Sequence, residues 1–251
     1  MIEIRNLKAQ NDEKTILDIE NFVFDENEVY LIAGMNGSGK SSFIKVLAND
    51  IDESKYQHLK LTGKIYVDGE DILTNVSARE KFNKYLCYVS QDDEFLTNSI
   101  ENELRIYYGI ANGISILKKE LISILQKLNV ETLLLKTFNK KELSEVFKLK
   151  LNSLSGGQKK IIHIVRELVK NDKIKYVLLD EPLNNLDIKN ITTISNLING
   201  IKADKTLIIV SHCKIFPFIT KEIKLSKGKF SECNYDCASC FGRANDAGFY
   251  E

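Results

Sequence analysis

The 251 residues leave room for one large α/β domain or two small ones, and 43% of them are apolar. Lys plus Arg and Asp plus Glu both number 35, and this balance argues against a nucleic-acid partner, which demands a basic face. No window approaches about 18 consecutive apolar residues and MIEIRNLKAQ lacks the apolar stretch of a signal peptide, so we expect a cytoplasmic protein.

The N-terminal part of the chain predicts strands around a glycine-rich loop. The alternation in MIEIRNL predicts an early strand, and two further strands are expected on either side of a turn at 25–28. The unbroken apolar run VYLIA (29–33) is typical of a strand buried on both faces, and KSSFIKVLAND (40–50) predicts a helix. A hairpin is expected over 63–72 and another strand over 85–90.

The second half of the chain alternates between helices and buried strands. From about Phe95 to Ser153 the pattern is helical. Two buried-strand runs follow, YVLLD (176–180) and LIIVS (207–211), with a helical stretch between them, and IKLSKGKF is expected as a closing strand. This alternation predicts a mainly parallel sheet. One helical face in the middle of the chain is predicted to carry Leu117, Leu121, Ile124, Leu125 and Leu128.

The stretch GMNGSGKSS (34–42) matches the pattern G-x-x-x-x-G-K-[ST] and lies between a predicted strand and a predicted helix. Glycines let backbone N–H groups curl around phosphates, Lys40 supplies positive charge to their oxygens, and the Ser41 hydroxyl is a ligand for Mg²⁺. The residues expected to hold a nucleotide here are Gly34, Asn36, Gly37, Ser38, Gly39, Lys40, Ser41 and Ser42.

Two carboxylates follow the buried run YVLLD. Asp180 ends that strand, where it is placed to hold Mg²⁺, and Glu181 is placed to polarise an attacking water as general base. An Asp-Glu pair alone is usually a solvated loop start. Together with the phosphate loop, it predicts the metal and base half of a nucleotide hydrolase.

A second anion cradle is predicted at LSGGQ (154–158), far from the first along the chain. Ser155 is a good N-cap, and Gly156 and Gly157 leave backbone N–H groups bare at the positive end of a helix dipole. A phosphate can approach such a backbone closely.

Four segments, GMNGSGKSS, LSGGQ, VLLDEP and VSH, resemble the motifs of ATP-binding cassette (ABC) proteins in order and spacing, over roughly residues 1–230. The resemblance implies that ATP is the nucleotide and that two cassettes pair head to tail, as a homodimer or a heterodimer. The phosphate loop of one cassette then faces the second cradle of the other. The residues implied to close over the γ-phosphate of the partner's ATP are Ser155, Gly156, Gly157 and Gln158.

Three further residues gain roles only through this resemblance. Gln91 resembles the glutamine that reaches Mg²⁺ and the attacking water, His212 the histidine that contacts the γ-phosphate, and Asp187 the aspartate that crosses the dimer interface. The implied catalytic set is Gln91, Lys40, Glu181 and His212, and the implied Mg²⁺ set is Ser41, Gln91 and Asp180.

The resemblance also implies the architecture. It is a phosphate-loop α/β core with a mainly parallel sheet, a peripheral antiparallel β subdomain and an α-helical subdomain. We expect an ABC ATPase domain over 1–230, built from a core (1–91 and 154–230) with a helical insert at about 92–153, and a tail over 231–251.

The sequence departs from the family pattern in two places. Family members commonly stack adenine on an aromatic side chain about twenty residues before the phosphate loop, but KAQNDEKTIL (8–17) holds none, and Phe22 and Phe24 are expected to belong to a strand. We therefore predict weak adenine affinity or relaxed base preference. Asn27 stands where a glycine often opens the strand before the loop, and Asn tolerates the left-handed backbone that this turn needs.

The tail carries Cys233, Cys237 and Cys240 as C-x₃-C-x₂-C. Three such thiols suit Zn²⁺, with a fourth ligand such as Cys213, or an iron–sulfur cluster; the alternative is a tail with solvent-exposed thiols.

Two functions fit an ATPase of this kind. The first is the motor subunit of a transporter, attached to the cytoplasmic face of the membrane through separate membrane-spanning subunits. The alternative is a soluble, non-transport cassette ATPase, for example in iron–sulfur assembly. A non-catalytic scaffold is disfavoured because every catalytic position is filled.

Overall fold

The computed structural model describes residues 1–11, 14–50, 59–91, 94–171, 173–212 and 216–232. Its central sheet has six strands in the order β10-β9-β3-β8-β7-β6. Every pairing in it is parallel except β9 with β10. The mainly parallel sheet is therefore confirmed. Its strands are β3 (Val29–Ala33), β6 (Leu86–Val89), β7 (Tyr176–Asp180), β8 (Thr206–Val210), β9 (Lys221–Ser226) and β10 (Lys229–Glu232).

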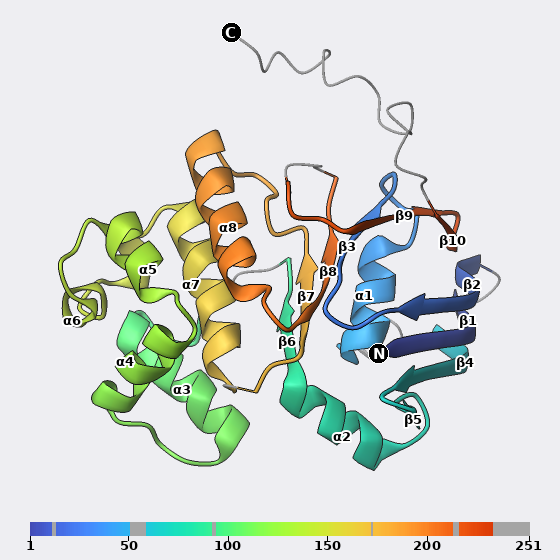
Figure 1. The fold of residues 1–251 in the computed structure, drawn as a ribbon, viewed down its shortest axis with the longest axis horizontal. Helices are drawn as coiled ribbons and strands as arrows, with labels where there is room; N and C mark the ends of the chain where they lie inside the picture. The colour runs from blue at the N-terminus through green and yellow to red at the C-terminus, as the bar shows by residue number, and fades with distance from the viewer. Residues whose placement is uncertain (12–13, 51–58, 92–93, 172, 213–215, 233–251) are drawn as a thin grey trace, which may run out of the picture.

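A second, antiparallel sheet lies at one end of the molecule, on the right of Figure 1, and confirms the peripheral β subdomain. Its strand order is β2-β1-β4-β5. Helix α1 (Lys40–Ala48) fills the space between the two sheets, where it buries Phe43, Ile44 and Leu47 in their shared core. The strands are β1 (Ile2–Asn11), β2 (Lys14–Phe24), β4 (Leu59–Val67) and β5 (Glu70–Asp71).

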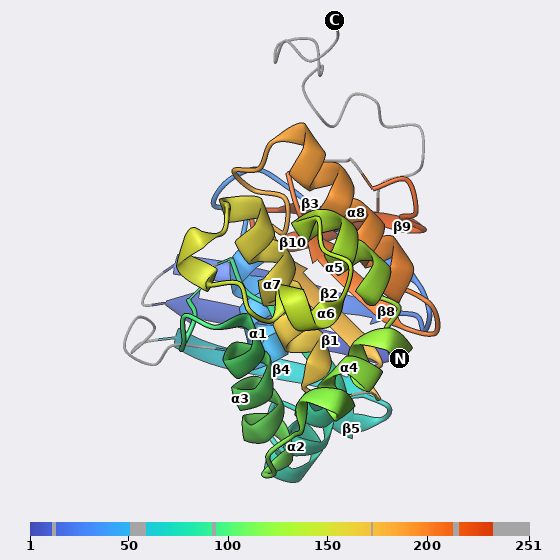
Figure 2. The same ribbon diagram turned by 90° about the vertical axis from the view of Figure 1, so that its left-hand side faces the viewer.

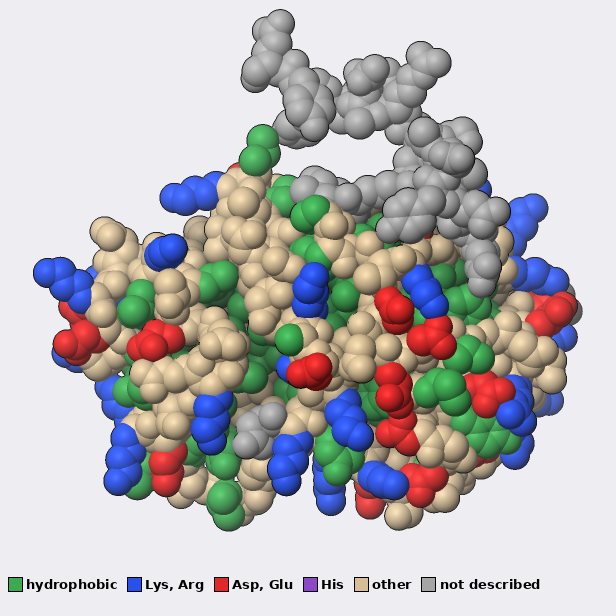
Figure 3. Space-filling model, viewed as in Figure 1, with side chains coloured by type: hydrophobic (Ala, Val, Ile, Leu, Met, Phe, Trp, Pro, Cys, Tyr) green, Lys and Arg blue, Asp and Glu red, His purple; other side chains and the backbone are tan. Residues whose placement is uncertain are grey.

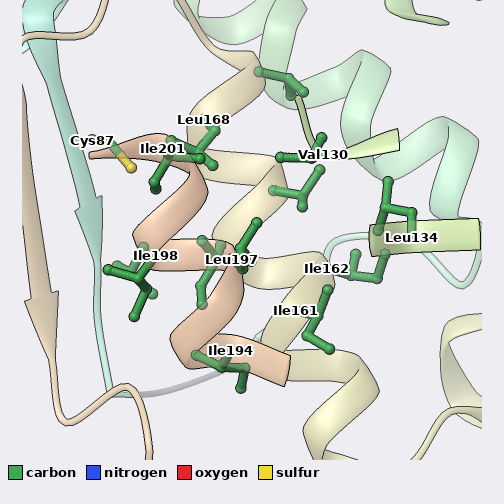
Figure 4. Packing of buried hydrophobic residues seen from close by; sticks show 14 of the residues in the cluster. Cys87, Val130, Leu134, Ile161, Ile162, Leu168, Ile194, Leu197, Ile198 and Ile201 are labelled. Carbon is green, nitrogen blue, oxygen red and sulfur yellow. The ribbon is translucent and has the colours of Figure 1, made fainter. Parts of the chain in front are cut away.

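The helices that follow β6 gather at the opposite end of the molecule, on the left of Figure 1 and at the front of Figure 2. Helices α7 (Gly156–Val169) and α8 (Ile188–Ile201) lie between them and the sheet. Figure 4 shows Ile161 and Leu168 of α7 packed beside Leu197 of α8. The outer elements are α3 (Ile100–Asn112), α4 (Lys118–Lys127), α5 (Glu131–Phe138), α6 (Leu143–Val146) and a 3₁₀ turn at Leu151–Ser153.

Three details differ from the expectations. Helix α2 (Val76–Tyr85), capped by Asn75, was not predicted. Leu117 does not share the buried face of Leu121 and Leu125, because it precedes the first turn of α4 as its N-cap and is 56% exposed. The single closing strand is in fact the antiparallel pair β9 and β10.

Candidate nucleotide site

The loop between β3 and α1 is held closely against neighbouring backbone. The Lys40 ammonium donates to the carbonyl oxygens of Gly34 (2.9 Å) and Met35 (3.1 Å), and the residue is 5% exposed. Burial lowers the pKa of Lys40, opposed by the charges of Glu181 and Asp180. A Cβ on Gly34 would lie 2.3 Å from the carbonyl oxygen of Leu225, so only glycine fits there.

Asp180 ends β7 in complete burial. Its Oδ1 accepts a hydrogen bond from the Ser41 hydroxyl at 3.2 Å, whereas its Oδ2 has no hydrogen-bond partner. Burial raises the pKa of Asp180, against the opposing effects of Ser41 and then of Lys45, Lys160 and Lys40. A buried carboxylate oxygen without a donor is costly, and a cation would relieve that cost.

Glu181 follows in a left-handed backbone conformation, with φ 48°, which is uncommon for a non-glycine residue. Its Oε1 lies 2.9 Å from His212 Nε2 but without hydrogen-bond alignment, and its Oε2 accepts from the His212 backbone N–H at 3.3 Å. Burial raises the pKa of Glu181, and the neighbouring His212 opposes this rise. The strained turn thus aims the carboxylate across the end of the sheet at His212.

One cavity of about 340 Å³ joins these groups. The phosphate loop and Glu181 line it together with Gln91, which follows β6, and His212, which follows β8. The ends of neighbouring parallel strands meet at one edge of a sheet, which is why residues so far apart in sequence converge here. Asn184, to which the sequence analysis gave no role, also lines this cavity, and its N–H donates to the Glu181 carbonyl at 3.2 Å.

These residues fit a divalent cation. Ser41 and Gln91 line the cavity with a hydroxyl and an amide, and Asp180, hydrogen-bonded to Ser41, offers a buried oxygen without a donor. Oxygen donors of these kinds are the ligands that Mg²⁺ prefers.

The second cradle has a different character. Ser155 caps α7: its hydroxyl accepts from the Gln158 N–H at 3.3 Å, and the Gln158 side chain accepts from the Ser155 N–H at 3.1 Å. This capping box confirms Ser155 as the N-cap. Ser155 and Gly156 are exposed, and a Cβ on Gly156 would meet nothing within 4 Å.

Gly157 is a glycine for another reason than Gly156. A Cβ there would lie 2.1–2.4 Å from the side chain of Asn190 in α8. Asn190 is in turn fixed by Asp187, the N-cap of α8, which accepts from its backbone N–H at 2.8 Å and from its amide at 2.9 Å. Gly157 therefore lets α7 approach α8 closely at Asn190, which is hydrogen-bonded to Asp187.

The two cradles line separate cavities. Ser155, Gln158 and Asp187 border a hollow of about 650 Å³ between α5, α7 and α8, which none of the phosphate-loop residues lines. The 340 Å³ cavity contains none of those three residues. Within one chain, the predicted site is thus divided into two halves.

The remaining expectations concern the base and the tail. Asn27 has φ 60°, which confirms the left-handed turn. Phe22 and Phe24 lie in β2, where Phe24 is fully buried, and their rings pack with that of Tyr30, so they are strand residues as predicted. The tail cysteines Cys233, Cys237 and Cys240, and Cys213, lie outside the described residues; metal analysis of protein purified without chelator tests their binding of Zn²⁺ or an iron–sulfur cluster.

Comparison with known proteins agrees with the motifs. A family described as ABC transporter matches residues 17–184. The phosphonates import ATP-binding protein of Fusobacterium nucleatum is 31% identical over 218 residues, covering 84% of this chain and 82% of that protein. The phosphate import ATP-binding protein of Saccharolobus solfataricus is 31% identical over 212 residues, covering 84% and 78%.

Solved structures share the fold. A dimeric ATP-binding cassette in a post-hydrolysis state, bound to ADP and Pi, is 21% identical, with a TM-score of 0.70 and coverage of 93% of this chain and 99% of that one. A bacterial ABC exporter with ATP bound is 22% identical, with a TM-score of 0.68 over 92% of this chain and 38% of that one. The chain belongs to the ABC transporter family and is the ATP-hydrolysing, nucleotide-binding subunit of an ABC transporter.

Proposed function

We propose that this subunit hydrolyses ATP as one half of a two-site, head-to-tail pair that powers transport through separate membrane subunits. The observation that carries the proposal is the division of the site. The phosphate loop and Glu181 line one cavity, with Asp180 buried behind Ser41, and Ser155 and Asp187 line another. A second cassette facing the first would bring a second cradle to each phosphate loop.

Each residue then has a chemical role in the reaction ATP + H₂O → ADP + phosphate. Lys40 and the amides of the 34–42 loop bind the β- and γ-phosphates and stabilise the charge of the transferring phosphoryl group. Glu181 takes a proton from the attacking water. Burial raises the pKa of this carboxylate, which makes it a stronger base. The backbone N–H of His212 holds one oxygen of Glu181 at 3.3 Å, and the imidazole Nε2 lies 2.9 Å from the other.

Mg²⁺ would be held by Ser41 and Asp180, and by Gln91, which lines the same cavity as Ser41. When bound, the ion supplies positive charge that neutralises the phosphate oxygens. The partner's Ser155–Gly157 segment would add N–H donors at a helix N-terminus from the opposite side. Because that segment reaches the γ-phosphate only when two cassettes meet, pairing and hydrolysis depend on each other.

The membrane partner has a candidate contact surface on the helical insert. Large apolar side chains are exposed on α3 and on the segments at either end of it, and this set is Leu96, Ile106, Ile110, Ile114 and Leu117. Exposed apolar side chains clustered in this way are typical of protein contacts. Among the described residues, no helix is both long enough and apolar enough to cross a bilayer.

The core (1–91 and 154–230) would bind nucleotide, and the insert (about 92–153) would meet the membrane subunits. Of the segment 231–251 expected as a tail, Ser231 and Glu232 lie in β10 and so belong to the central sheet. The subunit would lie on the cytoplasmic face of the membrane. Figure 3 shows Lys and Arg side chains interspersed with Asp and Glu over one face, which fits a partner other than nucleic acid.

Size measurement of the Glu181→Gln protein tests the proposal. Without the base, ATP is bound but not cleaved, so we expect a dimer in excess Mg-ATP and a monomer without nucleotide. The Lys40→Met, Glu181→Gln double variant is the control and should remain monomeric. A Glu181→Gln protein that stays monomeric at saturating Mg-ATP would contradict the paired mechanism.

A further inference from the structure

A lysine that the proposed mechanism does not use is buried on α7, the helix that begins at the second cradle. Lys160, in α7, is 5% exposed. Its ammonium donates to the carbonyl oxygens of Ser90 (3.0 Å) and Gln91 (3.3 Å). Burying an ammonium group is costly, so its position is closely specified by these acceptors. Lys160 therefore fixes the backbone at the residue that enters the phosphate-loop cavity.

The same lysine lies close to the second cradle. It follows Ser155 by five residues on one unbroken helix, so little more than one helical turn separates them. Ser155 is the cap of that helix and Gln158 completes the cap. A shift of the Ser90–Gln91 segment would pull on the turn of α7 that presents the cradle.

A second contact ties the far end of the same loop to α7. Arg166 donates to the carbonyl oxygen of Glu94 (2.6 Å) and to the fully buried carboxylate of Glu103 (3.0 Å). That carboxylate also accepts from the N–H groups of Leu96 (3.2 Å) and Thr97 (2.9 Å). The segment after β6 is thus fastened to α7 both at Gln91 and at residues 94–97, so the loop and α7 move together.

Lys160 therefore joins two parts of the chain. Its ammonium contacts the Gln91 backbone, and its own backbone belongs to the helix that Ser155 caps. In a head-to-tail pair, Gln91 and Asp180 serve the chain's own ATP, whereas Ser155 serves the ATP held by the partner.

We propose that Lys160 is a positioning residue that couples the two ATP sites of the pair, by holding Gln91 of one site and the Ser155 cradle of the other in one fixed arrangement. The inference rests on the proposed paired function. A purely local role would confine the effect of a Lys160 substitution to one of the two sites, and this difference is measurable.

Mixed pairs with one working site separate the two roles. One copy carries Lys40→Met, so the working site uses the other copy's phosphate loop and the Ser155 of the Lys40→Met copy. In the first arrangement, Lys160→Met is placed in the copy with the intact loop, beside the Gln91 in use. In the second arrangement, Lys160→Met is placed in the Lys40→Met copy, the copy whose Ser155 faces the working site.

The matched control is Lys159→Met, which removes the neighbouring half-buried lysine; within the described part of the chain its side chain makes no hydrogen bond to the loop. The reference is the pair with Lys40→Met alone. If that reference pair does not form or does not turn over, the proposed function fails rather than the role of Lys160. Where Lys160→Met does not fold, Lys160→Gln replaces it, because its amide keeps a donor without the charge.

We expect kcat to fall by about tenfold or more in both arrangements, as for other misplaced catalytic groups, with KM for Mg-ATP changed by less than about threefold. The KM should hold because the phosphate loop itself is intact. A fall in only one arrangement, a fall in neither, or an equal fall with Lys159→Met would overturn the coupling role.

Discussion

The two halves of the candidate site differ in how completely their polar groups are satisfied. In the phosphate-loop half, Asp180 is fully buried with one oxygen lacking a donor, and Glu181 sits in a strained turn. In the other half, Ser155 is exposed and makes both bonds of its capping box. The first half holds charges that a bound cation would relieve, whereas the second is stable alone and gains a role only when another molecule covers it.

The largest loss of turnover is expected in the phosphate-loop half of the site, and it would sharpen this comparison most. Glu181→Gln should lower kcat roughly a thousandfold, the scale of general base catalysis, with little change in KM for Mg-ATP. Steady-state turnover measures it. His212→Ala should cost less, because it removes the imidazole near Glu181 but keeps the base and the backbone N–H that holds it. A Glu181→Gln enzyme within tenfold of wild type would assign the base to another residue.

Gly156 and Gly157 of the second cradle give a matched pair of variants, with smaller effects on turnover and on unfolding temperature. Gly156→Ala should leave the unfolding temperature unchanged or slightly higher, because its Cβ points into open space and Ala is the better helix former. Its turnover should still fall by about a hundredfold, as for reacting groups displaced by about 1 Å, because the methyl group would meet the partner's nucleotide.

Gly157→Ala should instead destabilise the folded chain itself. Its Cβ would press on Asn190, and overpacking of this kind costs about 1–3 kcal/mol. Thermal unfolding without nucleotide separates the two variants. Equal unfolding temperatures for both would show that the α7–α8 contact does not constrain this segment.

The buried Asp180 carboxylate, with one oxygen lacking a donor, predicts that Asp180→Asn stabilises the folded chain in a pH-dependent way. Because burial raises the pKa of Asp180 above its unfolded value, the ionised form destabilises the folded state, and that penalty is lost as pH falls through the raised pKa. Asp180→Asn should therefore raise the unfolding temperature of nucleotide-free protein at about pH 8 by about 2–4 °C, the response to about 1 kcal/mol.

The gain from Asp180→Asn should shrink as the pH falls toward the raised pKa of Asp180, while Mg²⁺-dependent turnover is lost at every pH. Differential scanning calorimetry at several pH values measures the gain. A variant less stable than wild type at high pH would mean that the carboxylate is satisfied in the nucleotide-free fold.

The smallest effect concerns the base end of the nucleotide. The stretch 8–17 holds no aromatic side chain, and Phe22 and Phe24 are committed to the strand core. Base stacking is worth roughly 1–3 kcal/mol where it occurs. The KM values for Mg-ATP and Mg-GTP should therefore lie within about tenfold of each other. Tight ATP binding with strong discrimination against GTP would reveal a base contact elsewhere.

Much of the fold was predictable because its signals are local. Unbroken apolar runs marked β3, β7 and β8, and the left-handed turn at Asn27 followed from the tolerance of that residue. Helix α2 was missed because only Ala78 and Phe82 are buried in it, which leaves almost no apolar periodicity. Its one local signal is the capping residue Asn75.

In the candidate site, too, local motifs were predictable and contacts between distant segments were not. Motifs alone located the phosphate loop, Asp180, Glu181 and Ser155. They could not show that Gly157 is needed for packing against Asn190, or that Lys160 is buried. Both facts arise from the approach of α7 to α8 and to the loop after β6, and side chains from distant segments decide such contacts.

Complementation between two inactive variants tests the central claim most directly. Lys40→Met removes the first half of the site, and Gly156→Asp places a carboxylate in the second. Mixed together, they can form a pair in which one complete site joins the intact loop of one copy to the intact cradle of the other. The account predicts that the mixture regains ATP turnover that neither variant has alone. A mixture as inactive as its components, in the presence of demonstrated mixed pairs, would show that both halves must come from one chain.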